Sequence, residues 1–364
     1  MKKLLIFFVS LSFVFPMCGC GKKDTPDKWT IGISMPNKAL ERWNKDGEYL
    51  KKKLTDSGYS TILQYPAGDA NTQINQIEDM EAKGAKVIVI AAVDTKSLAN
   101  VLNKAKTQNI TVIAYDRLIT DTEDVDFFVT FNNKEVGVMQ AKFVEKKLGL
   151  REKKGPFNIE FIAGDQADEN AHSFYNGAMS VLKEYIDSGK LIVPSGQIAF
   201  EKVVTPGWET AKAQSRMDNI IVANYLGQKK LDAVLATSDC LSLGVINALK
   251  TADIIKNLET NSENILLNPI ITGQDCDKAN VASIVKGEQS MSVFKDTRKL
   301  GDKVKDIIDS LYEGKEIEIN GEEKFNNGAK DVTTYFFEPV CIEKDNLVKE
   351  LIESGYYKKE ECNW

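Results

Sequence analysis

A continuous apolar run, VIVIAA, occupies residues 87–92 and indicates the class of the fold. It is short and has no polar face, which is the pattern of a strand buried on both sides of a parallel sheet. Parallel strands are joined by crossover helices, and helical patterns flank this run on both sides. The sequence therefore predicts βαβ units with right-handed crossovers.

The same rhythm of strand and helix extends in both directions from this run. Upstream, Asp69 can cap a helix that Gly84 ends. Downstream, apolar residues recur at helical spacing from Leu98 to Ala105. We predict further strands at four short apolar runs, which are Trp29–Met35, Thr61–Tyr65, Ile110–Tyr115 and Phe127–Phe131.

A second series of strands follows Gly155-Pro156. We predict them at Phe157–Ala163, Gln197–Ala199, Asp232–Ala236, Ile270–Thr272, Ser290–Phe294 and Thr333–Cys341, with a helix from Thr297 to Leu311. About 340 residues would remain after loss of a leader, more than one hydrophobic core usually organises. The predicted fold class is therefore α/β, with two doubly wound parallel-sheet lobes and a cleft between them.

The first residues have the features of a secretory signal. Lys2 and Lys3 precede an apolar core, Leu4–Phe15, that is too short to span a bilayer. Small Gly19 then stands directly before Cys20. Cleavage between them would make Cys20 the mature N-terminus, the position that bacterial lipoproteins modify with lipid.

We therefore predict residues 1–19 as a signal peptide and 20–28 as a lipoprotein linker, with Cys20 as the lipidation site. The protein would be exported and anchored to the outer face of the bacterial cytoplasmic membrane. Cys18 is a poorer candidate because bulky Met17 precedes it. A plain signal peptide with incidental cysteines is the alternative.

Acidic residues outnumber basic ones, 53 against 47. Loss of Lys2 and Lys3 would leave 45 basic residues and a formal net charge near −8. The basic residues are interleaved with acidic ones, whereas a nucleic-acid partner needs a basic footprint. This composition argues against nucleic-acid binding.

Cysteine and histidine do not indicate metal chemistry. Cys240, Cys276, Cys341 and Cys362 include no C-x-x-C pair, and His172 is the single histidine. A zinc site is not expected at these spacings, and we predict no metal and no cofactor. Three disulfide pairings are possible for four cysteines, so the sequence leaves their redox state open.

Polar or aromatic residues follow the predicted strands, at the edge where doubly wound sheets bind ligands. They are Asn37, Lys38, Glu41, Arg42, Trp43, Asp94, Asp116, Arg117, Asn132 and Asn133 in the first half, and Asp165, Asp168, Glu169, Asn170, Ser238, Asp239, Gln274 and Asp275 in the second. Planar Asp, Asn and Arg groups can bind neighbouring sugar hydroxyls. Trp43, Phe131, Phe174 and Trp208 could cover the C–H faces of a sugar. Turns also favour Asp and Asn, and Trp43 fits the apolar stripe of its helix, so a structural role remains open.

Six motifs resemble those of the xylose-binding and multiple-sugar-binding periplasmic proteins. They are Ile33-Ser34-Met35-Pro36 with Lys38, Glu41, Arg42 and Trp43; AYDRLI at 114–119; GPFNIE at 155–160; RMDN at 216–219; GQD at 273–275; and FKDTR at 294–298. The resemblance runs in order from Trp29 to Tyr357. It implies a type I solute-binding fold, two lobes joined by three crossover segments, that closes on an aldose and delivers it to an ABC permease. The family is not enzymatic, so no catalytic residue is expected.

The resemblance also implies which segments form each lobe and which residues touch the sugar. We expect 29–131 with 295–320 in the N-terminal lobe, and 132–294 with 321–364 in the C-terminal lobe. The implied contacts are Lys38, Arg42, Trp43, Asp116, Arg117, Asn132, Asn133, Asn170, Trp208, Asp239, Asp275 and Lys295. Asn132 and Asn133 would lie at the first crossover and Lys295 at another. A monomer is expected.

The chain departs from the family pattern at a few positions. Asn132 stands where relatives commonly carry an aspartate, so an amide that also donates replaces a carboxylate acceptor. His172 either lines the cleft or lies on the surface of the helix after Asn170. Cys240 and Cys276 each follow a proposed contact and are expected to be small packing residues.

The resemblance implies hinge closure driven by a sugar that bridges the lobes. In this interpretation a neutral sugar accepts hydrogen bonds from Arg42, Arg117 and Lys295, and carboxylates such as Asp116 and Asp275 pair with these cations. A site for a phosphosugar would instead leave its cations without carboxylate partners. A sensor that hands its closed form to a chemoreceptor or histidine kinase would have the same site. A glycosidase with paired carboxylates is a more remote alternative. A transcription regulator of this fold would need a helix-turn-helix where the signal sequence stands.

Overall fold

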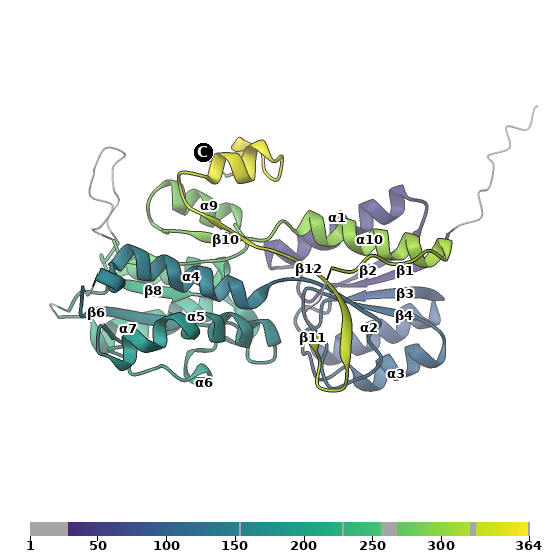
Figure 1. The fold of residues 1–364 in the computed structure, drawn as a ribbon, viewed down its shortest axis with the longest axis horizontal. Helices are drawn as coiled ribbons and strands as arrows, with labels where there is room; N and C mark the ends of the chain where they lie inside the picture. Colours follow the sequence, from purple (N-terminus) through teal and green to yellow (C-terminus); the bar gives the residue numbers. More distant parts are fainter. Residues whose placement is uncertain (1–27, 153, 228, 256–267, 321–324, 363–364) are drawn as a thin grey trace, which may run out of the picture.

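The computed structural model describes residues 28–152, 154–227, 229–255, 268–320 and 325–362. The predicted signal peptide, the linker up to residue 27 and the lipidation site Cys20 lie outside the described residues. No helix in the described part of the chain is long and apolar enough to cross a membrane. The described chain forms two α/β lobes placed side by side (Figure 1).

The N-terminal lobe is built on a seven-stranded sheet with the order β11-β12-β5-β4-β3-β1-β2. Its strands are β1 (Thr30–Ser34), β2 (Ser60–Gln64), β3 (Ala85–Ile90), β4 (Thr111–Tyr115), β5 (Phe127–Phe131), β11 (Phe325–Asn326) and β12 (Asp331–Phe337). Its helices are α1 (Glu41–Asp56), α2 (Ala70–Ala82), α3 (Ala99–Thr107) and α10 (Thr297–Glu313). All pairings are parallel except β11 with β12.

The apolar run at 87–92 lies in and just after the central strand β3, and its alternate side chains face two separate cores. Val87 and Val89 pack with residues of α1 and α10 on one face of the sheet. Ile88 and Ile90 pack with residues of α2 and α3 on the other face. Both faces are therefore covered by helices, which confirms the predicted doubly wound fold and explains why the run has no polar face.

The C-terminal lobe has a four-stranded parallel sheet with the order β7-β6-β8-β9. Its strands are β6 (Phe157–Ile162), β7 (Leu191–Ile192), β8 (Ala233–Ala236) and β9 (Ile270–Ile271), and a pair formed by β10 (Ser292–Phe294) and β13 (Val340–Ile342) joins it through a Gln274–Val293 bridge. Its helices are α4 (Asn133–Leu148), α5 (Glu169–Asp187), α6 (Phe200–Val203), α7 (Thr210–Asn224), α8 (Asp239–Thr251) and α9 (Lys278–Val285). Short helical segments are η1 (Leu150–Glu152), η2 (Pro206–Trp208), η4 (Val348–Glu353) and η5 (Lys359–Cys362).

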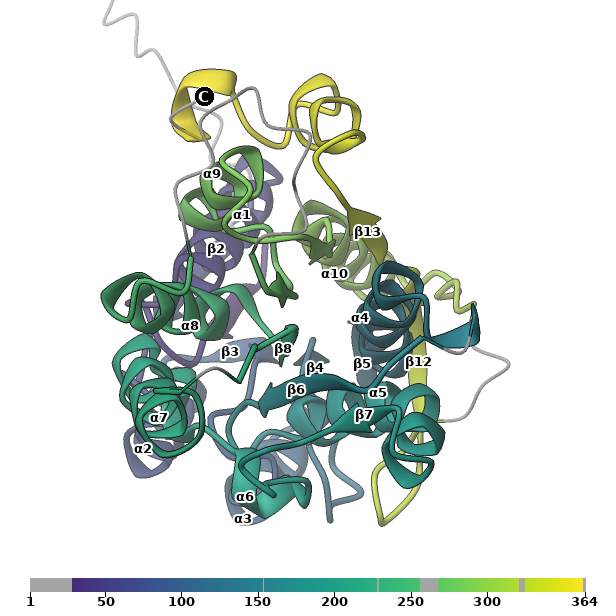
Figure 2. The same ribbon diagram turned by 90° about the vertical axis from the view of Figure 1, so that its left-hand side faces the viewer.

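The chain passes between the lobes in three described places. The first crossing is Asn132, between β5 and α4, and the second is Lys295-Asp296, between β10 and α10. The third is Glu338-Pro339, where β12 of one lobe leads into β13 of the other (Figure 2). Asn132 and Lys295 therefore lie where the family resemblance implied.

The third crossing corrects two predictions. The segment Thr333–Cys341 was expected as one strand, but Pro339 has no N–H to donate and the chain changes sheets there. Residues 321–364 were expected in the C-terminal lobe, yet β12 pairs with β5 from Thr333–Phe127 to Phe337–Phe131. Residues 325–337 thus belong to the N-terminal lobe.

The strand predicted at Gln197–Ala199 is also wrong. Those residues form no strand and lead into α6, while the neighbour of β6 is the two-residue strand β7 at Leu191–Ile192. The four described cysteines, whose redox state the sequence left open, are all free thiols.

Candidate ligand-binding site

A pocket lies between the lobes. It is lined by Leu40, Arg42, Trp43, Asp116, Arg117, Asp168, Asn170, Phe174, Trp208, Ser238, Cys240, Gln274, Asp275, Asp277 and Lys295. Eight of the residues predicted to touch the ligand are among them, namely Arg42, Trp43, Asp116, Arg117, Asn170, Trp208, Asp275 and Lys295. Both lobes and the second crossing contribute.

Four other predicted contacts do not line the pocket. Lys38 is exposed, with its Nζ 5.7 Å from the centre of the Tyr65 ring. Asn132 caps α4 by accepting from the Glu135 N–H. Asn133 is buried behind the pocket residue Asn170 and donates a hydrogen bond to its Oδ1 at 2.8 Å.

Asp239 is the fourth, and it is fully buried behind the pocket. Its carboxylate accepts from Gln289, from Ser292 and from the Asp277 N–H. Burial, together with the neighbouring carboxylate of Asp275, raises the pKa of Asp239 to about 8. Asp239 therefore supports the loops that carry the pocket residues.

Two further candidates also lie outside the lining. Phe131 belongs to the core of the N-terminal lobe, where its ring meets Phe337 at 5.7 Å. His172, left open by the sequence, packs its ring 4.1 Å from that of Phe200, and its Nε2 is 3.0 Å from the Gln166 carbonyl oxygen. Neither supplies a surface to the pocket.

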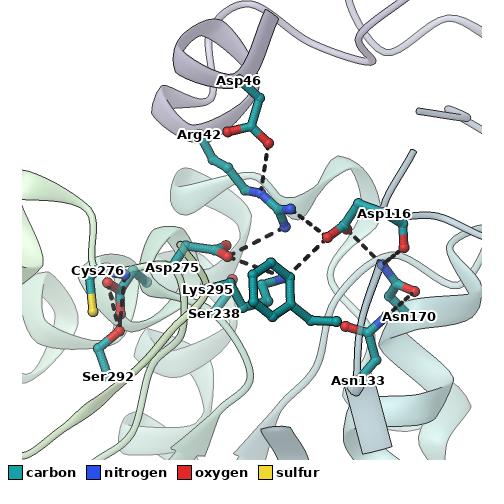
Figure 3. A network of polar contacts seen from close by, with 12 residues as sticks. Arg42, Asp46, Asp116, Asn133, Asn170, Ser238, Asp275, Cys276, Ser292 and Lys295 are labelled. Atoms are coloured by element: carbon teal, nitrogen blue, oxygen red, sulfur yellow. Dashed lines mark hydrogen bonds and ion pairs between the residues drawn. The ribbon is translucent and has the colours of Figure 1, made fainter. Parts of the chain in front are cut away.

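Arg42 stands at the centre of an ionic network that joins the lobes (Figure 3). From α1 it donates to Asp116 of its own lobe and, at 3.4 Å, to Asp275 of the other lobe. Lys295, on the second crossing, lies 3.6 Å from Asp116 and 3.4 Å from Asp275. Two cations and two carboxylates thus alternate across the cleft.

The network controls the ionisation of its members. Burial alone would raise the pKa of Asp116, but the charges of Arg42 and Lys295 outweigh it and lower that pKa to about 2. Burial opposes the charge of Arg42, yet Asp116, Asp275 and Asp46 raise its pKa well above the ordinary value. Asp116 and Arg42 are therefore charged at neutral pH.

A second ion pair crosses the cleft beside the first. Arg117 Nε lies 2.8 Å from Asp168 Oδ2, and both side chains are almost fully buried. Arg117 also donates to the carbonyl oxygen of Ala92 at 2.8 Å. Nearby, the Asn170 amide donates to Asp116 Oδ1 at 3.0 Å, and the Thr95 N–H donates to the Ala167 carbonyl oxygen at 3.2 Å. These contacts join the two lobes directly, so the structure is that of a closed form.

Aromatic rings supply the apolar surfaces. Trp43 of the N-terminal lobe lies under the guanidinium groups of Arg42 and Arg117, at 4.5 and 5.0 Å. In the C-terminal lobe, the rings of Phe174 and Trp208 meet edge to face at 6.3 Å. The indole of Trp208 fits only because residue 164 is glycine: a Cβ there would lie 2.0 Å from Trp208 Cη2.

Several buried polar atoms of the lining have no hydrogen-bond partner among the described residues. They are Trp208 Nε1, Gln274 Oε1 and Lys295 Nζ; the two carboxylates nearest to Lys295 lie 3.4 and 3.6 Å away. An unsatisfied buried polar group costs about 1–3 kcal/mol, so a ligand that completes these bonds gains binding energy. Most of these atoms are donors, which suits hydroxyl oxygens.

The sequence-based set of contacts left out some lining residues. Asp168, Ser238 and Gln274 follow predicted strands, and Phe174 is one of the rings expected to cover a sugar, but none of the four is among the expected contacts. Asp277 was missed, because it lies two positions beyond the expected contact Asp275. The sequence feature that indicates Asp277 is the short acidic motif D-C-D at 275–277, which repeats an aspartate two positions after an expected contact.

Comparison with known proteins identifies the family. Residues 31–316 match the family model described as a periplasmic binding protein domain. The chain belongs to the periplasmic binding proteins. Its fold is the type I form of that family, as the resemblance implied.

Two relatives and one solved structure match this binding protein along nearly their whole length. It is 47% identical to the multiple sugar-binding periplasmic receptor ChvE of Rhizobium radiobacter, over 92% of each chain. It is 34% identical to the D-xylose-binding periplasmic protein of Escherichia coli K12, over 91% of this chain and 92% of the relative. A solved ABC transporter solute-binding protein from Clostridium phytofermentans, with bound β-D-glucose, has a TM-score of 0.85 and 46% identity, covering 92% of this chain and 99% of its own.

Proposed function

We propose that this protein binds a neutral monosaccharide, an aldose such as xylose, glucose or galactose, between its lobes. The observation that carries the proposal is the balance of the pocket: Arg42, Arg117 and Lys295 are each paired with a carboxylate, while Trp208 Nε1 and Gln274 Oε1 have no hydrogen-bond partner among the described residues. Sugar hydroxyls accept from such donors and donate to such carboxylates. Trp43, Phe174 and Trp208 cover the C–H faces. The relatives named for sugars and the glucose-bound structure support the same ligand class.

The ligand would act by favouring the closed form. A sugar that touches both lobes binds the closed state better than the open one, and this difference drives hinge closure. The closed protein would then deliver its sugar to an ABC permease. We propose that it works as a monomer, exported and held at the outer face of the cytoplasmic membrane by lipid on Cys20. Neither a cofactor nor catalysis is part of this proposal.

A sensory role is the alternative that a specific observation favours. The relative from Rhizobium radiobacter is named a receptor, and a sensor would use the same ligand site. In that case the closed form would bind a chemoreceptor or histidine kinase. Capture of membrane partners by the glucose-bound and sugar-free protein distinguishes a permease from a sensor.

A thermal-shift screen tests the ligand class. The protein starting after Gly21 is melted with xylose, glucose, galactose, arabinose, fucose and ribose, and with glucose 6-phosphate as the anionic control. A sugar at one hundred times its Kd adds about 2.7 kcal/mol of stability. We expect this with one or more free aldoses and not with the phosphate, because each pocket cation is already paired. Stabilisation by the phosphate alone, or by none of the aldoses, would contradict the proposal.

A further inference from the structure

Asp277 of the pocket lining has a side chain that its own helix does not use. It stands at the N-cap of α9, where an aspartate usually accepts a hydrogen bond from the first turn. No such capping bond is present at Asp277, whereas Asp69 and Asp168 cap their helices in that way. Asp277 instead lines the pocket, and the residue is partly exposed.

Asp277 also differs from the other three carboxylates that line the pocket. Asp116 and Asp275 pair with Arg42 and Lys295, and Asp168 pairs with Arg117. Among the described residues, no lysine or arginine is within ion-pair distance of Asp277. Burial, followed by the repulsion of Asp239, raises the pKa of Asp277 well above its ordinary value, and Asp275 and Glu41 act in the same direction. The lining therefore has one carboxyl group in excess of its cations.

A second acceptor on the same loop also lacks a partner. Gln274 is 2% exposed, lines the pocket, and its Oε1 receives no hydrogen bond from the described residues. Gln274 and Asp277 flank the network carboxylate Asp275 on the segment between β9 and α9. This side of the pocket offers acceptors, whereas Lys295 and Trp208 offer donors.

We propose that Asp277, with Gln274, forms a subsite for a cationic or strongly donating substituent, so that the pocket also accepts aldoses carrying a primary ammonium group. The inference rests on the proposed binding of monosaccharides and narrows its ligand class. An ammonium group has three donors and no acceptor, which matches a carboxylate beside an amide oxygen. It would also favour the ionised form of Asp277, whose pKa is raised by burial and by Asp239, and charge-assisted hydrogen bonds are the stronger kind.

The test compares matched sugars on wild type and Asp277→Asn. The probes are D-glucose, D-glucosamine, 6-amino-6-deoxy-D-glucose and N-acetyl-D-glucosamine, measured by isothermal titration calorimetry. Asparagine keeps the shape and is an equally good N-cap residue, so the variant is expected to fold. Asp345→Asn, which removes one exposed carboxylate from the same lobe, is the control for net charge.

We expect at least one of the two amino sugars to bind wild type as tightly as D-glucose. Asp277→Asn then weakens that amino sugar tenfold or more and D-glucose less than threefold, while Asp345→Asn changes neither. If D-glucose binds and both amino sugars fail, the subsite is refuted and the proposed function stands. Equal losses for both ligands in Asp277→Asn also refute it. If only an amino sugar binds, the subsite is supported and the neutral-sugar proposal fails.

Discussion

Replacing Arg117 by alanine should disable the site without unfolding the protein. The guanidinium holds Asp168 of the other lobe at 2.8 Å, and both side chains are below 10% exposed. Removing one partner of a buried pair costs about 3–5 kcal/mol, because the other charge is left buried. In an open form water would hydrate Asp168, so the cost falls on closure rather than on folding.

The expected loss of sugar affinity follows from that cost. The lower figure, about 3 kcal/mol, corresponds to a Kd roughly one hundred times higher. At a sugar concentration that stabilises wild type by about 2.7 kcal/mol, the variant would gain about 0.4 kcal/mol. Titration calorimetry with D-glucose gives the Kd, and denaturant unfolding of the sugar-free protein gives the stability.

Arg151→Ala is the matched control. Arg151 also pairs with a carboxylate, Glu145, at 2.8 Å, but its side chain is 74% exposed. Exposed pairs contribute little, so its removal should leave the Kd unchanged. The reasoning is refuted if Arg117→Ala binds within threefold of wild type, or if its sugar-free form unfolds while Arg151→Ala remains stable.

Three other predictions follow from the described geometry and the sequence. Gly164→Ala should displace the Trp208 indole and weaken sugar binding at least tenfold in calorimetry. The control is Gly227→Ala, which should not change the affinity because no atom lies within 4 Å of a Cβ at that position. Equal affinities of the two variants would contradict the role of the Trp208 ring. Because the pKa of Asp116 is lowered to about 2, its stabilising charge is fully present above about pH 4 and is lost as the pH falls through 2. The difference in unfolding free energy between wild type and Asp116→Asn should therefore fall by about 2 kcal/mol between these pH values. A difference that does not change with pH would refute this prediction. Cys20→Ser should move the protein from the membrane fraction to the soluble fraction; membrane retention would exclude a lipid anchor at Cys20.

Local sequence patterns predicted most of the fold because buried parallel strands are short, apolar and separated by helices. They failed where the deciding partner is distant in the sequence. Only Glu338-Pro339 separates two runs that both favour strands, Thr333–Phe337 and Val340–Cys341, so the local pattern does not reveal that β12 pairs with β5 and β13 with β10. Leu191–Ile192 forms a strand of only two residues, too short for alternation to stand out.

The site was predicted at the level of the strand ends but not in the direction of each side chain. A position after a strand places a residue at the correct edge of the sheet. Whether it then faces the ligand depends on its backbone turn and its neighbours. Asp116 has a left-handed backbone conformation and lines the pocket. Asp239 lies behind the pocket, where Gln289 and Ser292 donate hydrogen bonds to its carboxylate. Among the described residues Lys38 has no such hydrogen-bond partner, and it is exposed to solvent beside Tyr65.

The central claim is that one neutral aldose binds between the lobes, and titration calorimetry of the protein with D-glucose, D-xylose and D-galactose tests it most directly. We predict saturable binding of one sugar per chain for at least one of them, with a Kd roughly one hundred times higher in Arg117→Ala and an unchanged Kd in Arg151→Ala. The absence of binding heat for all three at millimolar concentrations, or binding that Arg117→Ala leaves intact, would contradict the account.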